Sequence, residues 1–302
     1  MRRFVLELFL VLFCFICFDL LIGYLGSYLT VKEPISDTDV EKVALFDAEA
    51  DIIILGSSRA NHHYDPKILS ETFNLTVYNA GRDGKDILYS YCVLSSMIER
   101  HVPQFVILDL GYGQLDGRWQ ERFNSNLRFY NLIPSVKEVS DNIFPLKEKW
   151  KLFMNTYRYN GQLLSMINAY MSPTSISDGY LPLNGVFDGD FNEENLRENS
   201  QEVRMPSYYD TILKRMIELC RRNKVELFVV YSPCIINNYQ NIPHFLEEYC
   251  RSNGLVYFNY DNIDKYSSFE LYKDEYHMNQ YGASVFTKDL CDDISLYLEN
   301  SI

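Results

Sequence analysis

Apolar residues recur along this chain in two alternating patterns. Short, mainly apolar runs rich in β-branched residues are typical of strands buried in a parallel sheet, and they cover residues 52–55, 75–78, 105–108, 225–231 and 255–260. Between these runs the apolar residues are spaced three and four apart, as on one face of a helix, from Asp65-Pro66 onward and over 87–98, 208–221, 242–251 and 280–298. This alternation predicts an α/β domain whose parallel sheet is covered by helices on both faces.

The amino end carries the longest apolar run of the chain. It extends from Phe4 to Leu25 and contains Glu7 and Asp19 as its charged residues. As a helix it would be roughly 33 Å long, enough to cross the hydrocarbon core of a bilayer. A cleavable signal peptide is the alternative, but the run is long and no small-x-small cleavage motif follows it.

Two arginines precede the apolar run and set its expected orientation. Positively charged residues stay on the cytoplasmic side of a membrane-spanning helix. We therefore expect a single-pass membrane protein with an anchor over residues 4–29, a cytoplasmic amino end and a periplasmic or extracellular main domain. Residues 30–50 are polar and acidic and contain Pro34, which predicts a tether to a domain over 51–302.

The strand pattern stops at about residues 114–204, which predicts an insertion after the third strand. Helical stretches are expected near 136–139 and over 150–171, followed by long loops rich in turn residues. An insertion at the carboxyl end of a strand lies where open α/β folds bind ligands, so we expect it to cover the site. Its Tyr, Trp, Asn and Asp side chains suit a carbohydrate-facing surface, although aromatic residues make up 15% of the whole chain.

The net charge and the cysteine content bear on which partners and metals the protein binds. The net charge is −13, which disfavours nucleic acid as a partner because phosphate contacts need clustered Lys and Arg. Five cysteines lie outside the apolar run without metal-ligand spacing, and their odd number predicts at least one free thiol. Adjacent His62 and His63, with Asp65, lack further ligands at metal-binding spacing, so we expect no metal. Gly111 and Gly113 lack the further glycine and the helix start of a dinucleotide fingerprint, and we expect no organic cofactor.

Two short stretches carry candidate chemistry. Gly56, Ser57 and Ser58 end the apolar run 52–55, which places a hydroxyl at a strand-to-helix turn, although Gly and Ser also serve turns alone. Near the carboxyl end, Asp274 and His277 are three residues apart. At that spacing Asp274 can fix the tautomer of His277 and leave its Nε2 atom as a base for a serine. The alternative is a helix start with an incidental histidine.

Together these stretches resemble the SGNH (GDSL-like) hydrolase family, in which the serine follows the first strand and a D-x-x-H pair follows the last. The resemblance covers residues 51–109 and 225–299 and implies a flavodoxin-like three-layer α/β/α fold with a five-stranded parallel sheet. It also implies Ser58 as nucleophile, His277 as base and Asp274 as its partner. Ser57 stands where the simplest members have aspartate. The GSSR start is similar to membrane-anchored members that act on cell-surface polymers, such as the lipoteichoic acid D-alanylation protein and polysaccharide O-acyl esterases.

The family's second and third sequence blocks supply the oxyanion donors. The second block matches Asn79 to Gly84, and the resemblance implies that the backbone N–H of Gly84 is one donor; the same glycines also suit an ordinary turn. In the third block Gly113 stands roughly where the family has asparagine. Either another group replaces that donor, such as Asn61, Arg59 or an asparagine of the insertion, or backbone N–H groups form the hole alone. Arg59 has the further alternatives of binding an anionic substrate group and of pairing with a nearby acid.

These observations lead to two functional expectations. The first is a membrane-anchored serine esterase or O-acyltransferase that acts on O-acyl groups of a cell-envelope or extracellular glycan through an acyl-serine intermediate. The second is a catalytically weak glycan-binding or accessory module that assists a membrane O-acyltransferase. The missing third-block asparagine, the anchor and the insertion favour this second expectation, because losing one oxyanion donor typically costs ~10²–10³ in rate.

Overall fold

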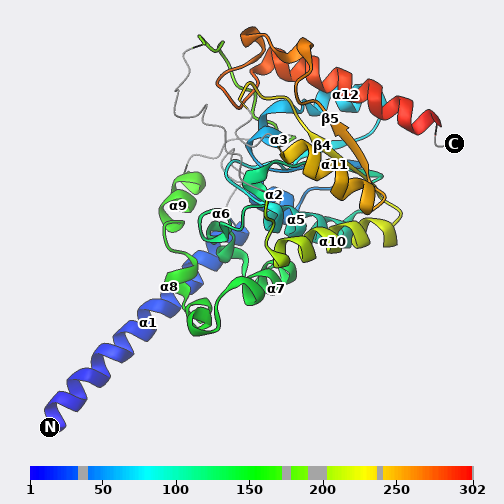
Figure 1. The fold of residues 1–302 in the computed structure, drawn as a ribbon. Helices are drawn as coiled ribbons and strands as arrows, with labels where there is room; N and C mark the ends of the chain where they lie inside the picture. Colours follow the sequence, from blue (N-terminus) through cyan, green and yellow to red (C-terminus); the bar gives the residue numbers. More distant parts are fainter. Residues whose placement is uncertain (33–39, 172–177, 190–202, 237–240, 301–302) are drawn as a thin grey trace.

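A five-stranded parallel sheet forms the centre of the protein (Figure 1), as a computed structural model shows for residues 1–32, 40–171, 178–189, 203–236 and 241–300. The strand order is β2-β1-β3-β4-β5. The strands are β1 Ile52–Leu55, β2 Val77–Asn79, β3 Phe105–Asp109, β4 Glu226–Tyr231 and β5 Val256–Asn259. All four neighbouring pairs are parallel, and β1 lies between β2 and β3 in the sheet. The predicted α/β fold class is confirmed.

Successive residues of each strand face opposite layers of helices. Ile52 and Ile54 of β1 pack on one side, and Ile53 and Leu55 pack on the other. All four are buried, which explains why β1 is a continuous apolar run instead of an alternating one.

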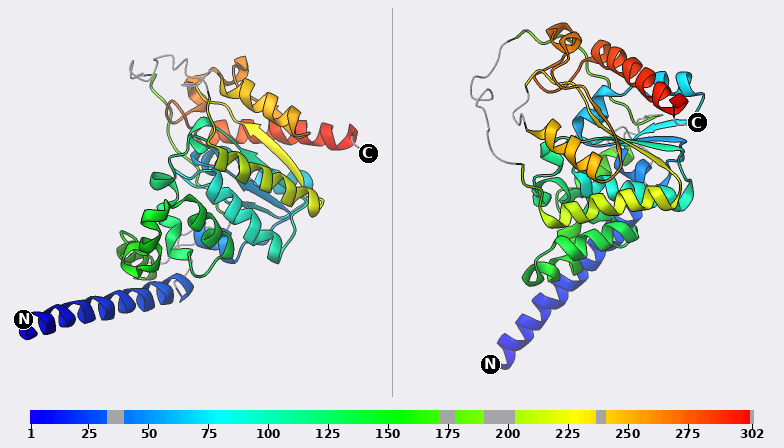
Figure 2. Two further views of the ribbon diagram at one scale, coloured as in Figure 1. Left: turned by 60° about the horizontal axis from the view of Figure 1, so that its bottom comes forward. Right: turned by 45° about the vertical axis from the view of Figure 1, so that its right-hand side comes forward.

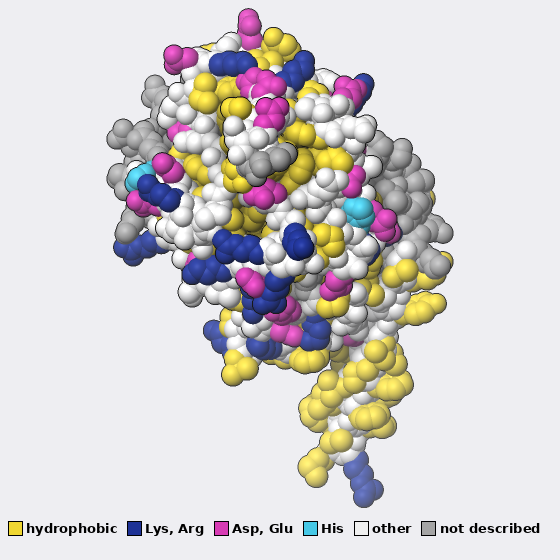
Figure 3. Space-filling view, turned by 90° about the vertical axis from the view of Figure 1, so that its right-hand side faces the viewer, with side chains coloured by type: hydrophobic (Ala, Val, Ile, Leu, Met, Phe, Trp, Pro, Cys, Tyr) yellow, Lys and Arg dark blue, Asp and Glu magenta, His cyan; other side chains and the backbone are white. Residues whose placement is uncertain are grey.

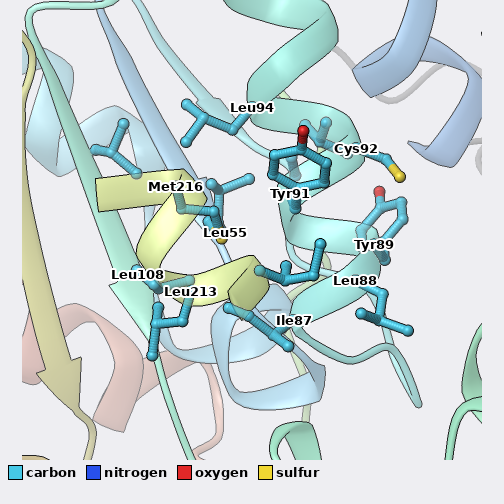
Figure 4. Close-up of a cluster of buried hydrophobic side chains, with 14 of the residues drawn as sticks. Leu55, Ile87, Leu88, Tyr89, Tyr91, Cys92, Leu94, Leu108, Leu213 and Met216 are labelled. Carbon is cyan, nitrogen blue, oxygen red and sulfur yellow. The ribbon is translucent and has the colours of Figure 1, made fainter. Parts of the chain in front are cut away.

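Two helical layers cover the sheet (Figures 1 and 2). The first layer packs on the side of Ile53 and consists of α2 Val40–Phe46, α5 Ile87–Arg100, α7 Pro134–Ile143, α10 Ser207–Arg222 and α11 Ile242–Ser252. Figure 4 shows part of this core, where side chains of α5 and α10 meet Leu55 and Leu108 of the sheet. The second layer packs on the side of Ile52 and consists of α3 Ser58–His63, α4 Pro66–Phe73 and α12 Gln280–Asn300. The result is a three-layer sandwich with an apolar core on each side of the sheet.

The amino-terminal helix α1, Arg2–Lys32, projects from the body of the protein (Figures 1 and 3). It is long and apolar enough to cross a membrane, as either an anchor or a signal sequence would be. Residues 33–39 of the expected tether lie outside the described residues. Residues 40–50 do not behave as a loose tether, since α2 packs against α5 and buries Ala44 and Leu45 completely.

The expected insertion divides into two parts. The first part runs as short helices below the sheet: η2 Tyr112–Gln114, α6 Trp119–Arg122, η3 Asn124–Phe129, α7, η4 Leu146–Phe153, α8 Asn155–Arg158 and α9 Leu163–Met171. The stretch expected to be helical over 150–171 is therefore interrupted, at extended Met154 and at Gly161, whose φ is +75°. The second described part, residues 178–189, crosses to the carboxyl ends of the strands. The remaining elements are η6 Asp264–Tyr266 and η7 Phe269–Leu271.

A buried ion cluster fastens the first part of the insertion to the domain. Glu41 of α2 lies 2.8 Å from Lys85 Nζ and 3.7 Å from a guanidinium nitrogen of Arg128 in η3. Lys85 also donates to Asn126 Oδ1 at 3.0 Å and to the Ser125 hydroxyl. One buried carboxylate thus compensates cations that come from two separate segments.

Replacing Glu41 by glutamine is expected to destabilise the protein strongly. Lys85 and Arg128 would remain buried with an uncompensated charge, which typically costs about 3–5 kcal/mol. The free energy of unfolding in detergent measures the effect, with Glu71→Gln on the surface of α4 as the control, expected to cost less than about 0.5 kcal/mol. Equal, small losses for both variants would contradict the prediction.

The same carboxylate predicts a pH dependence. Burial acts to raise the pKa of Glu41, but the charges of Lys85 and Arg128 outweigh it and hold that pKa below its usual range. Because the folded-state pKa is the lower one, the stabilisation by this group is present above the unfolded pKa of Glu. It is lost as pH falls through the folded-state pKa.

Candidate active site

Ser58 is placed by a sharp turn between β1 and α3. Gly56 has φ of +147°, and a side chain there would lie 2.7 Å from Ala60 Cβ and 2.8 Å from the backbone oxygen of Asp109. Glycine is therefore required for the chain to turn so close to β3. Ser57 then takes the N-cap position of α3, and Ser58 is its first residue, at the carboxyl end of the sheet.

Ser58, His277 and Asp274 form a continuous chain of hydrogen bonds. Ser58 Oγ lies 2.7 Å from His277 Nε2. His277 Nδ1 lies 2.9 Å from Asp274 Oδ1 and 3.1 Å from Oδ2. With Nδ1–H donated to the carboxylate, Nε2 is left to accept the serine proton. The structure thus brings together the three residues that the sequence motifs indicated, 219 and 216 residues apart from Ser58 in the chain.

The loop that carries Asp274 and His277 is held tightly. Asp274 Oδ1 accepts the backbone N–H groups of Tyr276 and His277, each at 2.9 Å. The backbone N–H of Lys273 donates back to the oxygen of His277 at 2.8 Å. Burial acts to raise the pKa of Asp274, but these hydrogen bonds and the one from His277 outweigh it and lower that pKa. Asp274 therefore stays ionised near neutral pH and can orient the imidazole.

His63 links α3 to the loop that carries Asp274 and His277. Its Nε2 accepts the backbone N–H of Met278 at 3.0 Å, and its Nδ1 lies 3.1 Å from Ser232 Oγ. Burial lowers the pKa of His63 well below its usual value, and the neighbouring charges of His277 and Arg59 add to that effect. A neutral His63 thus serves as a brace between α3, the loop at Met278 and the end of β4. The sequence offered no signal for this role beyond the presence of a histidine.

His62 forms a second histidine–aspartate pair beside the triad. Its Nε2 lies 3.1 Å from Asp83 Oδ1, its Nδ1 lies 2.6 Å from the backbone oxygen of Leu181, and its ring is 5.5 Å from that of His277. Both ring nitrogens thus face acceptors. Burial acts to lower the pKa of His62, but the hydrogen bonds to Asp83 and Leu181 outweigh it and raise that pKa. The pair ties α3 to the loop that contains Gly84.

Replacing Asp83 by asparagine is expected to lower the pKa of His62, because the negative charge beside Nε2 is removed. The charge of Asp274 also acts on this ring and stays in place. NMR titration of ring-labelled histidines, five in the chain, measures the shift. In the parent protein the raised pKa means that protonated His62 stabilises the fold at low pH, and that this stabilisation is lost as pH rises through the folded-state value. An unchanged His62 titration in the variant would contradict the assignment.

The loop after β2 lies directly against the turn at Ser58. The backbone N–H of Arg82 donates to the oxygen of Gly56 at 3.3 Å. Gly81 packs so closely on α3 that a Cβ there would lie 2.5 Å from the backbone nitrogen of Asn61. Gly84 has φ of +69°, and a Cβ there would meet open space. Its position and openness fit the expected role of a backbone oxyanion donor, which stays a prediction.

The other expected binding residues point elsewhere. Arg59 donates to the backbone oxygens of Ser232 and Leu110 at 3.0 and 3.1 Å and lies 3.4 Å from Asp109. Its guanidinium thus serves the interior beneath the site. Asn79 is fully buried and is engaged with backbone groups of Ala60, Tyr64 and Gly81. These contacts explain both residues without a bound substrate, so neither has a place in the proposed oxyanion hole.

Neither Asn61 nor Gly113 of the third block supplies the second oxyanion donor. The Nδ2 group of Asn61 donates to Asp83 Oδ1 at 2.8 Å, so it is not free for a substrate. Gly113 carries no side-chain donor, and a Cβ there would lie 3.1 Å from Arg122. The backbone N–H of Ser58 and the asparagines of the insertion remain as candidates beside the N–H of Gly84.

The second part of the insertion runs along the site. The backbone N–H of Leu181 donates to the oxygen of Asn61, and the oxygen of Leu183 accepts the N–H of Gln280 at 2.7 Å. Farther on, the N–H of Phe187 donates to the oxygen of Tyr272 at 2.8 Å. Residues 178–189 therefore bridge α3 and the loop that carries Asp274 and His277, as expected for a segment that covers part of the site. Residues 172–177 and 190–202, on either side of this segment, lie outside the described residues.

A cavity of about 410 Å³ opens at the carboxyl ends of β4 and β5. Its lining includes Cys234, Ile235, Tyr260 and Tyr266. The backbone N–H of Ile235 donates to the oxygen of Glu275, so the cavity borders the loop that carries the triad histidine.

Comparisons with known proteins give only distant matches. No family model and no curated protein matches the sequence. A G-D-S-L family protein from Desulfitobacterium hafniense is 13% identical, with a TM-score of 0.41 over 80% of this chain and 97% of the other. A protein described as an acylhydrolase from Bacteroides fragilis is 10% identical, with a TM-score of 0.38 over 88% and 93%. A GDSL-like lipase from Bacteroides thetaiotaomicron is 11% identical, with a TM-score of 0.37 over 90% and 99%. Scores of this size support no functional conclusion by themselves.

Proposed function

We propose that this protein is a membrane-anchored serine hydrolase of SGNH type that transfers O-acyl groups of a cell-envelope or extracellular glycan through an acyl-serine. The observation that carries the proposal is the chain of hydrogen bonds from Ser58 through His277 to Asp274. An isolated serine is a weak nucleophile, and a base held in one tautomer by a carboxylate is the standard way to activate it.

The chemistry follows from the positions of the three groups. Ser58 Oγ attacks the ester carbonyl carbon while His277 Nε2 takes the hydroxyl proton. The backbone N–H groups of Ser58 and Gly84 receive the developing oxyanion. Collapse of the tetrahedral intermediate breaks the ester bond, and the departing glycan hydroxyl takes its proton from His277. A second hydroxyl then attacks the acyl carbon while His277 takes its proton, the bond to Ser58 Oγ breaks, and His277 returns the proton to Ser58. Water as the attacking group gives an esterase, and a sugar hydroxyl gives an O-acyltransferase.

Separate observations support the glycan substrate and the membrane location in this proposal. The segment beside the triad carries polar side chains, including the exposed Asn184, which suit hydrogen bonding with sugars. The resemblance of the GSSR start to anchored members points the same way. Helix α1, as a retained anchor with a cytoplasmic amino end, would hold the site on the outer side of the membrane near such polymers.

A second function is favoured by one specific observation. Two of the side chains considered as replacements for the third-block asparagine, Arg59 and Asn61, are engaged with protein groups. The domain can then serve as a glycan-binding or accessory module that assists a membrane O-acyltransferase and turns over slowly itself.

Incubating the full chain in detergent with an O-acetylated polysaccharide separates the two functions. The proposed enzyme releases acetate, or moves it to an added acceptor sugar, at a rate that depends on Ser58. Retention of the polysaccharide with no acetate released, together with a co-purifying membrane acyltransferase, would support the accessory role instead.

A further inference from the structure

The two helices that flank α8 expose an unusual set of apolar side chains. On η4, Leu146 is 86%, Trp150 58% and Phe153 78% exposed. On α9, Leu164 is 77% and Met171 76% exposed, seven residues apart and hence on the same face. Single exposed apolar residues are normal on a soluble surface, but a concentrated set marks an interaction site. We refer to these five residues as the apolar rim.

The apolar rim lies where α1 joins the domain. Asp19 of α1 accepts the backbone N–H groups of Asn155 and Thr156 at 3.1 and 2.8 Å and caps the start of α8. It also accepts the side chains of both residues, at 2.9 and 2.8 Å. Four donors thus satisfy the acid that interrupts the apolar run, which a segment destined only for cleavage does not require.

Further contacts seat α1 against α8 and α9 (Figure 1). Ser27 Oγ lies 3.0 Å from the hydroxyl of Tyr159, and Leu29 packs with Tyr159 and Met166 in a small buried cluster. Gly23 and Gly26 allow this approach, since a Cβ at either position would lie 2.4 to 2.6 Å from Asn155 or Tyr159. The outer part of α1 is therefore an integral element of the fold.

The rise per residue of a helix gives the distance of these contacts from Phe4 along the axis of α1. From Phe4 to Asp19 the axis rises roughly 23 Å, and to Gly23 roughly 29 Å, about the thickness of a hydrocarbon core. Tyr24 and Tyr28 follow and are exposed, in the place of an interfacial aromatic belt. An anchor that starts at Phe4 therefore brings α8 and its neighbours to the outer membrane interface.

The charge of η4 suits the same surface. Its sequence is LKEKWKLF, with three lysines and one glutamate, giving a net charge of +2 in a chain of net charge −13. Lysine stems can lie along lipid while their ammonium groups reach phosphate, and tryptophan prefers this interface. A basic, aromatic segment beside a membrane-spanning helix is complementary to a lipid surface.

We propose that the apolar rim inserts into the outer leaflet of the membrane that α1 spans, and that the lysines of η4 contact lipid phosphates. The inference rests on the anchor role of α1 in the proposed function. The occupant is lipid because α8, which lies between the two helices of the rim, is bonded to α1, and because η4 carries positive charge. The domain is thus fixed to the membrane at two places, and the triad faces a defined direction above the surface instead of swinging on a tether.

Tryptophan fluorescence tests this directly, because the chain has two tryptophans. Trp119 is partly buried and packs on Phe144, with ring centroids 4.7 Å apart, whereas Trp150 belongs to the rim. The full-length Trp119→Phe variant is placed in vesicles of phosphatidylcholine and phosphatidylglycerol whose acyl chains carry bromine. We expect bromine near the carbonyl end to reduce Trp150 emission by about half or more, as for a side chain at the interface. The Trp150→Phe variant, which reports Trp119, should be quenched far less.

A third variant separates failure of the inference from failure of the anchor. Phe13→Trp, with Trp119 and Trp150 both replaced by Phe, reports whether α1 lies in the bilayer, and deep bromines should quench it. Quenching at position 13 without quenching at Trp150 would overturn the rim proposal and leave the anchor standing. Absence of quenching at both positions would contradict both the rim proposal and the anchor role of α1. Trp150 shielded from bromine and from aqueous iodide would mean that protein covers the rim, which also overturns the proposal.

Discussion

The Ser58→Ala variant is expected to lose essentially all hydrolysis of an activated ester such as p-nitrophenyl acetate. Removing the nucleophile of a serine triad typically lowers kcat by about 10⁴–10⁶, and what remains reflects substrate binding and the oxyanion hole. In this protein the hydroxyl 2.7 Å from His277 Nε2 would be gone, and His277 would have no proton to take. Initial rates corrected for uncatalysed hydrolysis measure the effect.

A matched serine elsewhere controls for general disturbance. Ser252 lies exposed at the end of α11, where its hydroxyl donates to a backbone oxygen of the same helix. Ser252→Ala should retain full activity, and both variants should unfold at the temperature of the parent protein. Retained turnover in a folded Ser58→Ala variant would exclude the acyl-serine route.

The Asp274→Asn variant is expected to fold but to lose about 10⁴ in kcat. An asparagine can donate to Nδ1 of His277, which would place the ring proton on Nε2, facing Ser58. The base would then be in the wrong tautomer, whereas KM should change little because the carboxylate does not bind substrate. Kinetics of the variant beside Asp292→Asn, an exposed carboxylate on α12, measure the difference.

The lowered pKa of Asp274 adds a pH dependence to this prediction. In the parent protein the carboxylate is retained until pH falls through its depressed pKa, so the orienting interaction survives mildly acidic conditions. In the asparagine variant the loss in rate should be constant with pH over that range. A variant with normal kcat would show that Asp274 is a structural neighbour of His277 and not its partner in catalysis.

The strands and the triad were accessible from sequence because each depends on a local pattern. Four consecutive apolar residues ending at Gly56 predicted β1 and its turn, and the structure has β1 at those positions. Asp274 and His277 are close in sequence, so their hydrogen bond follows from local spacing. Ser58 lies beside them because the carboxyl ends of all strands of a parallel sheet, and the loops that follow them, lie at the same edge.

Other features depend on distant contacts and left no local signal. The six residues of α3 have no apolar periodicity, and the helix is stabilised by bonds such as those of His63 to Ser232 and Met278. Asp19 interrupts the amino-terminal apolar run, and its four donors come from residues more than 130 positions away. Glu41 falls in the predicted tether, and its partners Lys85 and Arg128 come from segments well separated from it in the sequence.

Labelling with a fluorophosphonate probe tests the central claim most directly. The full chain in detergent is treated with the probe, and the modified residue is located by mass spectrometry. We predict one adduct on Ser58, absent in His277→Ala, because only a serine with a hydrogen-bonded base reacts readily. A folded protein whose Ser58 stays unmodified, or reacts equally without His277, would contradict it.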